Sequence, residues 1–253
     1  MKLSACLLTF NEERWIDLCI EHMYDYVDEI LCLDAGSSDG TISILNKYDK
    51  VKYYIVPQPS SLRGQPGWNE GDRRNILQNT AKGEWILCLG CDELIEDEAW
   101  DNINNWINDD NVLGWGFYRI NYIYSLEWHK PINLPDNGGE VRIYKNSPLI
   151  KWEVKNSHNF LRCYNEQKSA DRNIYSRSVT MYNHHNVHNS KYLIHHMHQI
   201  GLRGHKPVYD RRHEDPKTIT EEYVRTHGFN KTKDNEYFRP IRYPKILYDK
   251  GLI

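Results

Sequence analysis

The sequence predicts an α/β fold in which a mostly parallel sheet is flanked by helices. Two observations carry this prediction. Short apolar runs that fit buried strands alternate along residues 2–89 with stretches whose apolar residues repeat at helical spacing. Turn residues separate the two kinds of segment. A β-α-β-α-β-α-β order of this kind is typical of a parallel sheet with helices on both faces.

Three of the first four strands, all but the one at 51–56, are expected where apolar residues predominate, as in buried strands. The helices between them have recognisable boundary signals. Asp39 can cap a helix that starts at Thr41, and Gly83 follows a helix that ends at Ala81. The expected strands are residues 2–9, 28–34, 51–56 and 85–89, and the expected helices are residues 15–23, 41–48 and 72–81.

The pattern changes after Gly114. An amphipathic helix at 96–107 precedes strands that look like a mixed or antiparallel extension of the sheet. Beyond residue 182 the chain is polar, and we expect a C-terminal helical or irregular region there. The later elements are strands at 115–126, 140–144 and 177–182 and a helix at 191–203. We therefore divide the chain into a first half (1–112), a mixed-sheet half of the same domain (113–182) and a C-terminal extension (183–253).

Composition restricts the class of protein. With 253 residues, 40% of them apolar, the chain can bury the core of one large domain, and its net charge of -3 gives no general attraction to nucleic acid. No apolar run approaches the roughly 18 residues of a transmembrane helix. The C-x-x-C of Cys88 and Cys91 has no second pair to complete a zinc site, so we expect reduced thiols. These features predict a cytoplasmic protein, either free or peripheral at the cytosolic face of a membrane.

Two carboxylates, Asp92 and Glu93, follow directly after the strand at 85–89. Ligands of open α/β sheets bind at the carboxyl ends of the strands. Carboxylate oxygens there suit Mg²⁺ or Mn²⁺, which usually also contacts substrate phosphates. The same two residues also fit the start of the next helix, because acidic side chains favour a helix N-terminus.

Three blocks in order carry a family resemblance: LLTFNEERWI at 7–16, ILCLDAGSSDGT at 30–41 and RRNILQNTAKGEWILCLGCDE at 73–93. Together they resemble the family-2 glycosyltransferases, especially bacterial and viral members related to lipopolysaccharide-core enzymes. The resemblance covers about residues 1–160 and implies the Rossmann-like GT-A fold. It also implies an inverting, metal-dependent transfer of a sugar from a UDP, GDP or dTDP sugar to a glycan, a lipid-linked glycan or another hydroxyl acceptor.

The resemblance also implies which residues contact the donor. Thr9 and Asp34, at the ends of the first two strands, would contact the base, and Glu12 would lie near the ribose. Asp39 fits a helix cap better than a ligand. Arg74 would lie near the diphosphate, because its planar guanidinium can donate two hydrogen bonds to phosphate. Its neighbour Arg73 is the alternative, and a solvated helix face is the other interpretation of Arg74.

The metal motif departs from the family pattern in two places. Gly90 stands where the first Asp of D-x-D is usual, while the middle residue Cys91 would adjoin the donor and Asp92 is retained as the metal ligand. In a later segment, residues 141–161, His158 matches a histidine that can complete the metal shell in related enzymes. A structural histidine is the alternative. The Glu that usually follows it is replaced by Asn159.

A catalytic base must lie within hydrogen-bond reach of the acceptor hydroxyl. Glu153 is the first choice because it lies in the same segment as His158, with Asp136 and Glu140 as alternatives. Asp92 would contribute to catalysis by neutralising the leaving diphosphate through its cation. The histidines between residues 184 and 198 fit a basic flap near the donor or acceptor better than a zinc site, and the expected helix at 191–203 could form a homodimer contact.

Two other functional classes stay open. A sugar-nucleotide nucleotidyltransferase shares this architecture but normally has a Gly-rich loop with Lys or Arg after the first strand, where this chain has Thr9-Phe-Asn-Glu-Glu13. A non-catalytic nucleotide-sugar or glycan-binding protein would be consistent with Gly90 and Asn159. Donor hydrolysis with Mn²⁺ separates this binding protein from a transferase.

Overall fold

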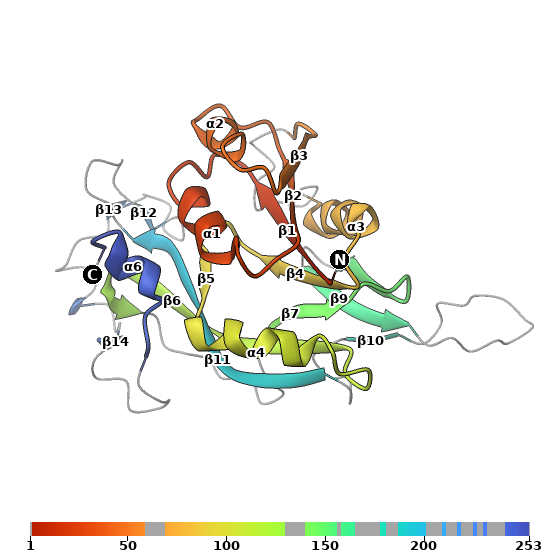
Figure 1. The fold of residues 1–253 in the computed structure, drawn as a ribbon. Helices are drawn as coiled ribbons and strands as arrows, with labels where there is room; N and C mark the ends of the chain where they lie inside the picture. Colours follow the sequence, from red (N-terminus) through yellow and green to blue (C-terminus); the bar gives the residue numbers. More distant parts are fainter. Residues whose placement is uncertain are drawn as a thin grey trace, which may run out of the picture.

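The computed structural model of this chain is organised around one large sheet with helices packed on both faces (Figure 1). The sheet has nine strands in the described part of the chain. No helix among the described residues combines the length and the apolar character needed to cross a bilayer. The described residues are 2–58, 69–129, 140–155, 158–164, 178–180, 187–200, 209–210, 217–218, 225–226, 230–231 and 241–252.

The first half of the sheet is parallel, as predicted. Its strands are ordered β3-β2-β1-β4, and every neighbouring pair is parallel. β1, β2 and β4 are almost fully buried, which explains why their sequences are continuous apolar runs. The elements are β1 (Leu3–Thr9), α1 (Ile16–Met23), β2 (Glu29–Asp34), α2 (Thr41–Leu45), β3 (Val51–Ile55), α3 (Glu70–Thr80) and β4 (Trp85–Leu89).

The second half is mixed, also as predicted. It continues from β4 in the order β7-β6-β11-β5, in which only the β6–β11 pair is parallel, and β14 pairs with β6. A smaller sheet, β10-β9-β8, packs beside α3. The elements are β5 (Glu93–Ile95), α4 (Asp97–Trp106), β6 (Gly114–His129), β7 (Glu140–Lys145), β8 (Ile150–Lys155), β9 (His158–Tyr164), β10 (Ser178–Thr180), β11 (Val187–Ile200), β12 (Tyr209–Asp210), β13 (Lys217–Thr218), β14 (Asn230–Lys231) and α6 (Lys245–Asp249).

The prediction of a helix at 191–203 is wrong. These residues overlap β11, a long strand that lies between β6 and β5 within the main sheet. The run Tyr192-Leu193-Ile194-His195 is buried throughout. A strand buried on both faces has no alternation of polar and apolar residues, and a short apolar run of this kind cannot be told from a buried helix by pattern alone. The region after residue 182 is therefore not a purely helical or irregular extension.

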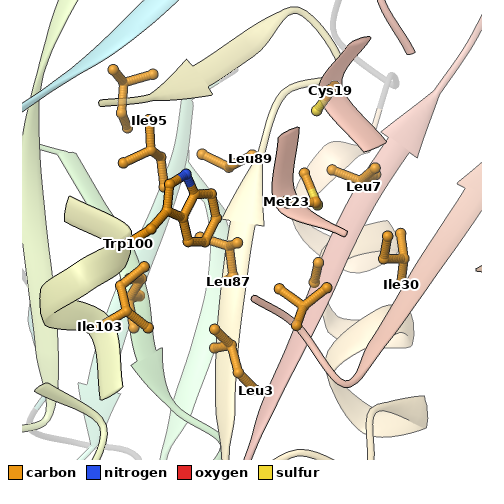
Figure 2. Packing of buried hydrophobic residues seen from close by; sticks show 14 of the residues in the cluster. Leu3, Leu7, Cys19, Met23, Ile30, Leu87, Leu89, Ile95, Trp100 and Ile103 are labelled. Carbon is orange, nitrogen blue, oxygen red and sulfur yellow. The ribbon is translucent and has the colours of Figure 1, made fainter. Parts of the chain in front are cut away.

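Two apolar layers cover the two faces of the sheet. One layer joins the inward sides of β1, β2 and β4 to α1 and α4, and Figure 2 shows Trp100 of α4 close to Leu87 and Leu89 of β4. The opposite layer includes Leu77 of α3 and Ile150 of β8. Because both faces are covered, the polar side chains at the ends of the strands are left at the carboxyl edge of the sheet.

Candidate active site

The register of the parallel strands gathers three predicted site segments at one edge of the sheet. Thr9, the last residue of β1, pairs with Asp34, the last residue of β2. On the other side of β1, Leu7 pairs with Leu89, the last residue of β4. The chain therefore leaves β1 and β2 at the same level and leaves β4 two residues earlier, so the turn 90–93 follows at the edge formed by Thr9 and Asp34.

Asp34 organises the loops at this edge. Its carboxylate accepts hydrogen bonds from Thr9 Oγ1 (2.8 Å), from the backbone N–H groups of Gly36 (2.8 Å) and Ser37 (2.7 Å), and from Ser37 Oγ (2.6 Å). Asp34 is fully buried and Thr9 nearly so. The expected proximity of Thr9 and Asp34 is confirmed, and these bonds hold the turn after β2 against the end of β1. Their contact with a nucleotide base stays a prediction.

The loop after β1 is tied to the turn after β2 by further bonds. Asn11 has a positive φ of 55° and its side chain accepts a bond from the backbone N–H of Ser38 (2.8 Å). The backbone N–H of Glu12 donates to Thr41 Oγ1 (2.7 Å). Asp39 Oδ1 accepts from the backbone N–H of Thr41 (2.9 Å), at the start of α2. The N-cap residue of α2 is Gly40, and α2 has no side-chain cap bond, so Asp39 is not the predicted helix cap; it lies one residue before the cap and makes this local bond instead.

The two arginines of α3 have different surroundings. Arg73 is buried, and its guanidinium donates to the carbonyl oxygens of Val56 (2.9 Å) and Leu33 (3.1 Å), which ties α3 to the ends of β2 and β3. Arg74 is only partly buried; it donates to the Cys88 thiol and lies over the ring of Trp152, with 5.0 Å to the ring centroid. Because the Arg73 guanidinium already bonds to two backbone carbonyl oxygens, Arg74 is the better placed of the two to bind a phosphate.

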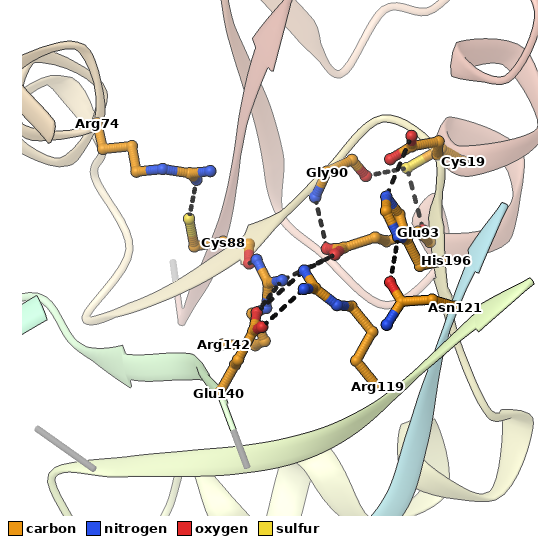
Figure 3. Close-up of polar contacts among 11 residues, drawn as sticks. Cys19, Arg74, Cys88, Gly90, Glu93, Arg119, Asn121, Glu140, Arg142 and His196 are labelled. Carbon is orange, nitrogen blue, oxygen red and sulfur yellow. Dashed lines mark hydrogen bonds and ion pairs between the residues drawn. The ribbon is translucent and has the colours of Figure 1, made fainter. Parts of the chain in front are cut away.

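The turn after β4 is closed by Glu93. Its Oε2 accepts a hydrogen bond from the backbone N–H of Gly90 (2.8 Å), and its Oε1 lies 2.7 Å from Arg142 Nη2 and 3.5 Å from Arg119 Nη1. Glu140 bonds to the same two arginines, at 2.6 Å and 3.0 Å. Figure 3 shows the two guanidinium groups between the two carboxylates. Burial disfavours the charged form of Glu93, but the nearby positive groups, Arg142 foremost, together outweigh it, and the pKa of Glu93 is lowered.

Asp92 faces a histidine from β11. Its Oδ2 lies 3.4 Å from His196 Nε2, and His196 Nδ1 lies 2.7 Å from Asn121 Oδ1 of β6 (Figure 3). A carbonyl oxygen can only accept, so His196 Nδ1 carries the hydrogen. His196 Nε2 therefore presents Asp92 with either a second proton, as in an ion pair, or the lone pair required of a metal ligand.

The remaining predicted residues differ in how they relate to the turn 90–93. The Cys91 thiol is buried in the core, where it donates to the Leu8 carbonyl (3.2 Å). Burial and, after it, the nearby Glu12 carboxylate raise the pKa of this thiol. Only the backbone of Cys91 is therefore available to a sugar-nucleotide donor. Glu12 thus lies near the turn 90–93. Glu153 is on β8 and pairs with Arg162 (3.2 Å).

Two predicted residues fall outside what the structure describes. The His158 side chain is outside the described part, although its backbone begins β9, and Asp136 lies wholly outside it. Of the three candidate bases, Glu140 is the one that the described contacts connect to the turn bearing Asp92.

Sequence reasoning missed Arg119, Arg142 and His196. Arg142 stands in the segment 141–161 that carried part of the resemblance, so its position in that block was an available signal. His196 lay within the histidine cluster, but the predicted helix gave it no relation to Asp92. Arg119 gave no local signal, because its role depends on the pairing of β6 with β7.

The sequence model of glycosyl transferase family 2 matches residues 4–172 of this chain. The chain belongs to this family. That match includes β1, β2, β4 and the turn 90–93, so it covers the edge where the side chains gather, and it confirms the resemblance on which the site residues were predicted.

Individual relatives are similar over part of the chain. A poly(ribitol-phosphate) beta-glucosyltransferase of Bacillus spizizenii is 34% identical over 126 residues, which are 45% of this chain and 19% of the relative. The lipopolysaccharide core biosynthesis glycosyltransferase LpsC of Rhizobium meliloti is 24% identical over 152 residues, 60% of this chain and 51% of the relative. The chain therefore spans only a fifth to a half of these two curated relatives.

Among solved structures, Staphylococcus aureus TarS residues 1–349 in complex with UDP-GlcNAc is similar, with a TM-score of 0.47 and 18% identity. The alignment covers 82% of this chain and 62% of that one.

Proposed function

We propose that this chain transfers a sugar from a nucleoside-diphosphate sugar to a hydroxyl acceptor, with inversion and with a divalent cation. The observation that carries the proposal is the position of Asp92. In a family 2 chain it stands at the carboxyl edge of the parallel strands and faces His196 across 3.4 Å. A glycan or a lipid-linked glycan is the proposed acceptor.

Asp92 and His196 are suited to share a cation. A carboxylate oxygen and an imidazole nitrogen are ligands that Mn²⁺ accepts, and Asn121 holds the imidazole in the tautomer that a ligand requires. Within the described ranges no three side chains of the His, Cys, Asp and Glu types form a metal cluster. Mg²⁺ and related cations at phosphate-transfer sites commonly take one or two protein ligands and fill the shell with phosphate oxygens and water. His158 stays a further predicted ligand.

Each residue at the carboxyl edge of the sheet has its own proposed role in sugar transfer. Asp92 and His196 would orient the leaving diphosphate, and Arg74 would donate to its oxygens. Thr9, Glu12 and Asp34, with the backbone of Cys91, would bind the nucleoside. A bound cation would offset the charge that develops on the leaving diphosphate. Glu153 remains the predicted base, with Glu140 as the alternative that shares the arginines of Glu93.

Donor hydrolysis tests the proposal. UDP, GDP and dTDP sugars are incubated with the protein and Mn²⁺, and release of nucleoside diphosphate is measured. We expect release with one nucleotide class, and loss of at least about 10²-fold in Asp92→Ala, because the leaving group then lacks its cation. Asp110→Asn, which changes an exposed carboxylate on the loop after α4, is the matched control and retains activity.

A thermal-shift series with the same nucleotides separates the alternatives. A ligand that binds only the native state raises the Tm. A Tm shift without turnover for any donor identifies a nucleotide-sugar-binding protein and overturns the transferase. Pyrophosphate-dependent formation of a nucleoside triphosphate from the sugar nucleotide identifies a nucleotidyltransferase. Location at a membrane and homodimerisation stay predictions.

A further inference from the structure

We propose that Arg142 is a positioning residue, which acts through Glu93 to hold the turn 90–93 in the shape that places Asp92 opposite His196 at the carboxyl edge of the sheet. The role of Asp92 as a cation ligand rests on the proposed function. The positioning of its turn rests on contacts within the chain.

The contacts form one path from β7 to the turn. Arg142 Nη2 donates to Glu93 Oε1 at 2.7 Å, and Glu93 Oε2 accepts from the backbone N–H of Gly90 at 2.8 Å. The backbone N–H of Glu93 also donates to the Gly90 carbonyl (3.2 Å), so both ends of the turn are tied to each other. The backbone of Asp92 lies between these two tied ends.

Burial makes this path sensitive to charge. Glu93 and Arg142 are 3% and 6% exposed, so each guanidinium–carboxylate contact is poorly screened by solvent. Removal of the Arg142 guanidinium leaves the Glu93 carboxylate with only the longer contact to Arg119 Nη1 (3.5 Å) among its described arginine contacts. The Glu93 side chain is then less firmly held, which weakens its bond to the Gly90 N–H and loosens the turn.

Gly90 is part of the same arrangement. A Cβ atom at residue 90 would lie 2.9 Å from Asp92 Oδ1 and 3.3 Å from Glu93 Cδ. The first atom to yield would be the Asp92 carboxylate oxygen, because it is the end of a side chain. The absence of a side chain at residue 90 and the Glu93–Arg142 pair therefore have the same effect, because both keep the Asp92 carboxylate in its position. We infer that introducing the acidic residue usual in the family, by Gly90→Asp, weakens cation binding.

The first measurement is hydrogen–deuterium exchange of the peptide that contains residues 90–93. Arg142→Gln is expected to speed exchange of the Gly90 amide at least about tenfold, since its acceptor is no longer fixed. Arg142→Lys, which keeps the charge and loses the planar fork, should give an intermediate rate. Arg242→Gln, which removes an exposed ion pair with Glu98 at 2.6 Å, is the matched control and leaves this peptide unchanged.

The second measurement is the Mn²⁺ dissociation constant, followed by the paramagnetic resonance signal of free Mn²⁺. Arg142→Gln and Gly90→Asp should each weaken binding about 10-fold or more, the range seen when a partner of a metal ligand is lost. Arg142→Lys should rescue part of it. Tighter Mn²⁺ binding in Gly90→Asp would overturn the inference about Gly90.

The two proposals fail in different ways. If the wild-type protein binds Mn²⁺ no better than Asp92→Asn does, the cation site is refuted. The exchange rates then still decide whether Arg142 holds the turn. Wild-type exchange in Arg142→Gln refutes the positioning role whatever the metal result. If Arg142→Gln does not fold, Glu93→Gln combined with Arg142→Gln removes both charges together and is expected to show the same faster exchange at Gly90.

Discussion

At the scale of single residues, the buried polar groups at the edge of the sheet serve structure and chemistry together. Asp34 accepts bonds from one side chain of β1 and from three donors in its own turn. A buried carboxylate is tolerated only when its oxygens are bonded in this way. The same bonds keep the loops after β1 and β2 in place around the proposed donor site.

Thr9 supplies the bond that joins the two strands. We expect Thr9→Val to lower the free energy of unfolding by about 1.5–3 kcal/mol, because a hydrogen bond to a buried carboxylate is lost. Thr9→Ser keeps the hydroxyl and should lose less. Urea denaturation of the three proteins measures the difference, and equal stability of the Val and Ser variants would contradict the role assigned to the hydroxyl.

At the scale of elements, Glu96 connects the start of α4 to β11. It is fully buried, its Oε2 accepts from the backbone N–H of Leu193 (2.9 Å), and its own N–H donates to the Leu193 carbonyl (3.2 Å). The register of β11 against β6 shifts between Asn189 and Leu193. Because Ile95 pairs with Ile194 in β5 and β11, the Glu96–Leu193 bonds extend this pairing by one residue, upstream of His196 on the same strand.

Replacement of Glu96 tests this connection. Glu96→Ala should destabilise the protein by about 1–3 kcal/mol, since a buried backbone N–H loses its acceptor. Glu96→Gln keeps a carbonyl oxygen and should cost less. Glu98→Ala, which removes an ion pair at the surface of the same helix, is the control and should change little. Similar urea midpoints for Glu96→Ala and Glu98→Ala would show that the junction of α4 with β11 does not depend on the Glu96 side chain.

At the scale of the whole molecule, buried histidines link stability to pH. His195 of β11 is fully buried beside Tyr122, and burial lowers its pKa to about 3. Burial also lowers the pKa of His22. Both are neutral in the folded chain, whereas in the unfolded chain they take up protons below their ordinary pKa of about 6.5. Stability is therefore complete above that pH and decreases as the pH falls below it.

The pH dependence of unfolding provides the measurement. For His195 the free energy of unfolding should fall by about 1.4 kcal/mol per pH unit below pH 6.5. His195→Gln should be less stable at pH 7.5, since the Tyr122 contact is altered, but its stability should vary less between pH 7.5 and 5. An unchanged slope in the variant would show that His195 is not the group responsible.

The local pattern of apolar residues in the sequence predicted the first half of the fold. β1, β2 and β4 appear where uninterrupted apolar runs predicted them, and Asp92 lies at the sheet edge because the run before it ends there. The same pattern failed at β11, since burial on both faces removes the alternation that distinguishes a strand.

The sequence by itself determined the α/β class, the parallel strands and the family, because each depends on short segments and their order. Only the tertiary structure decided the partners of the turn 90–93. Arg142 lies 49 positions from Glu93 in the chain, and His196 reaches Asp92 only because β11 enters the sheet beside β5. Contacts of this kind follow from strand register and packing, which no local pattern of residues encodes.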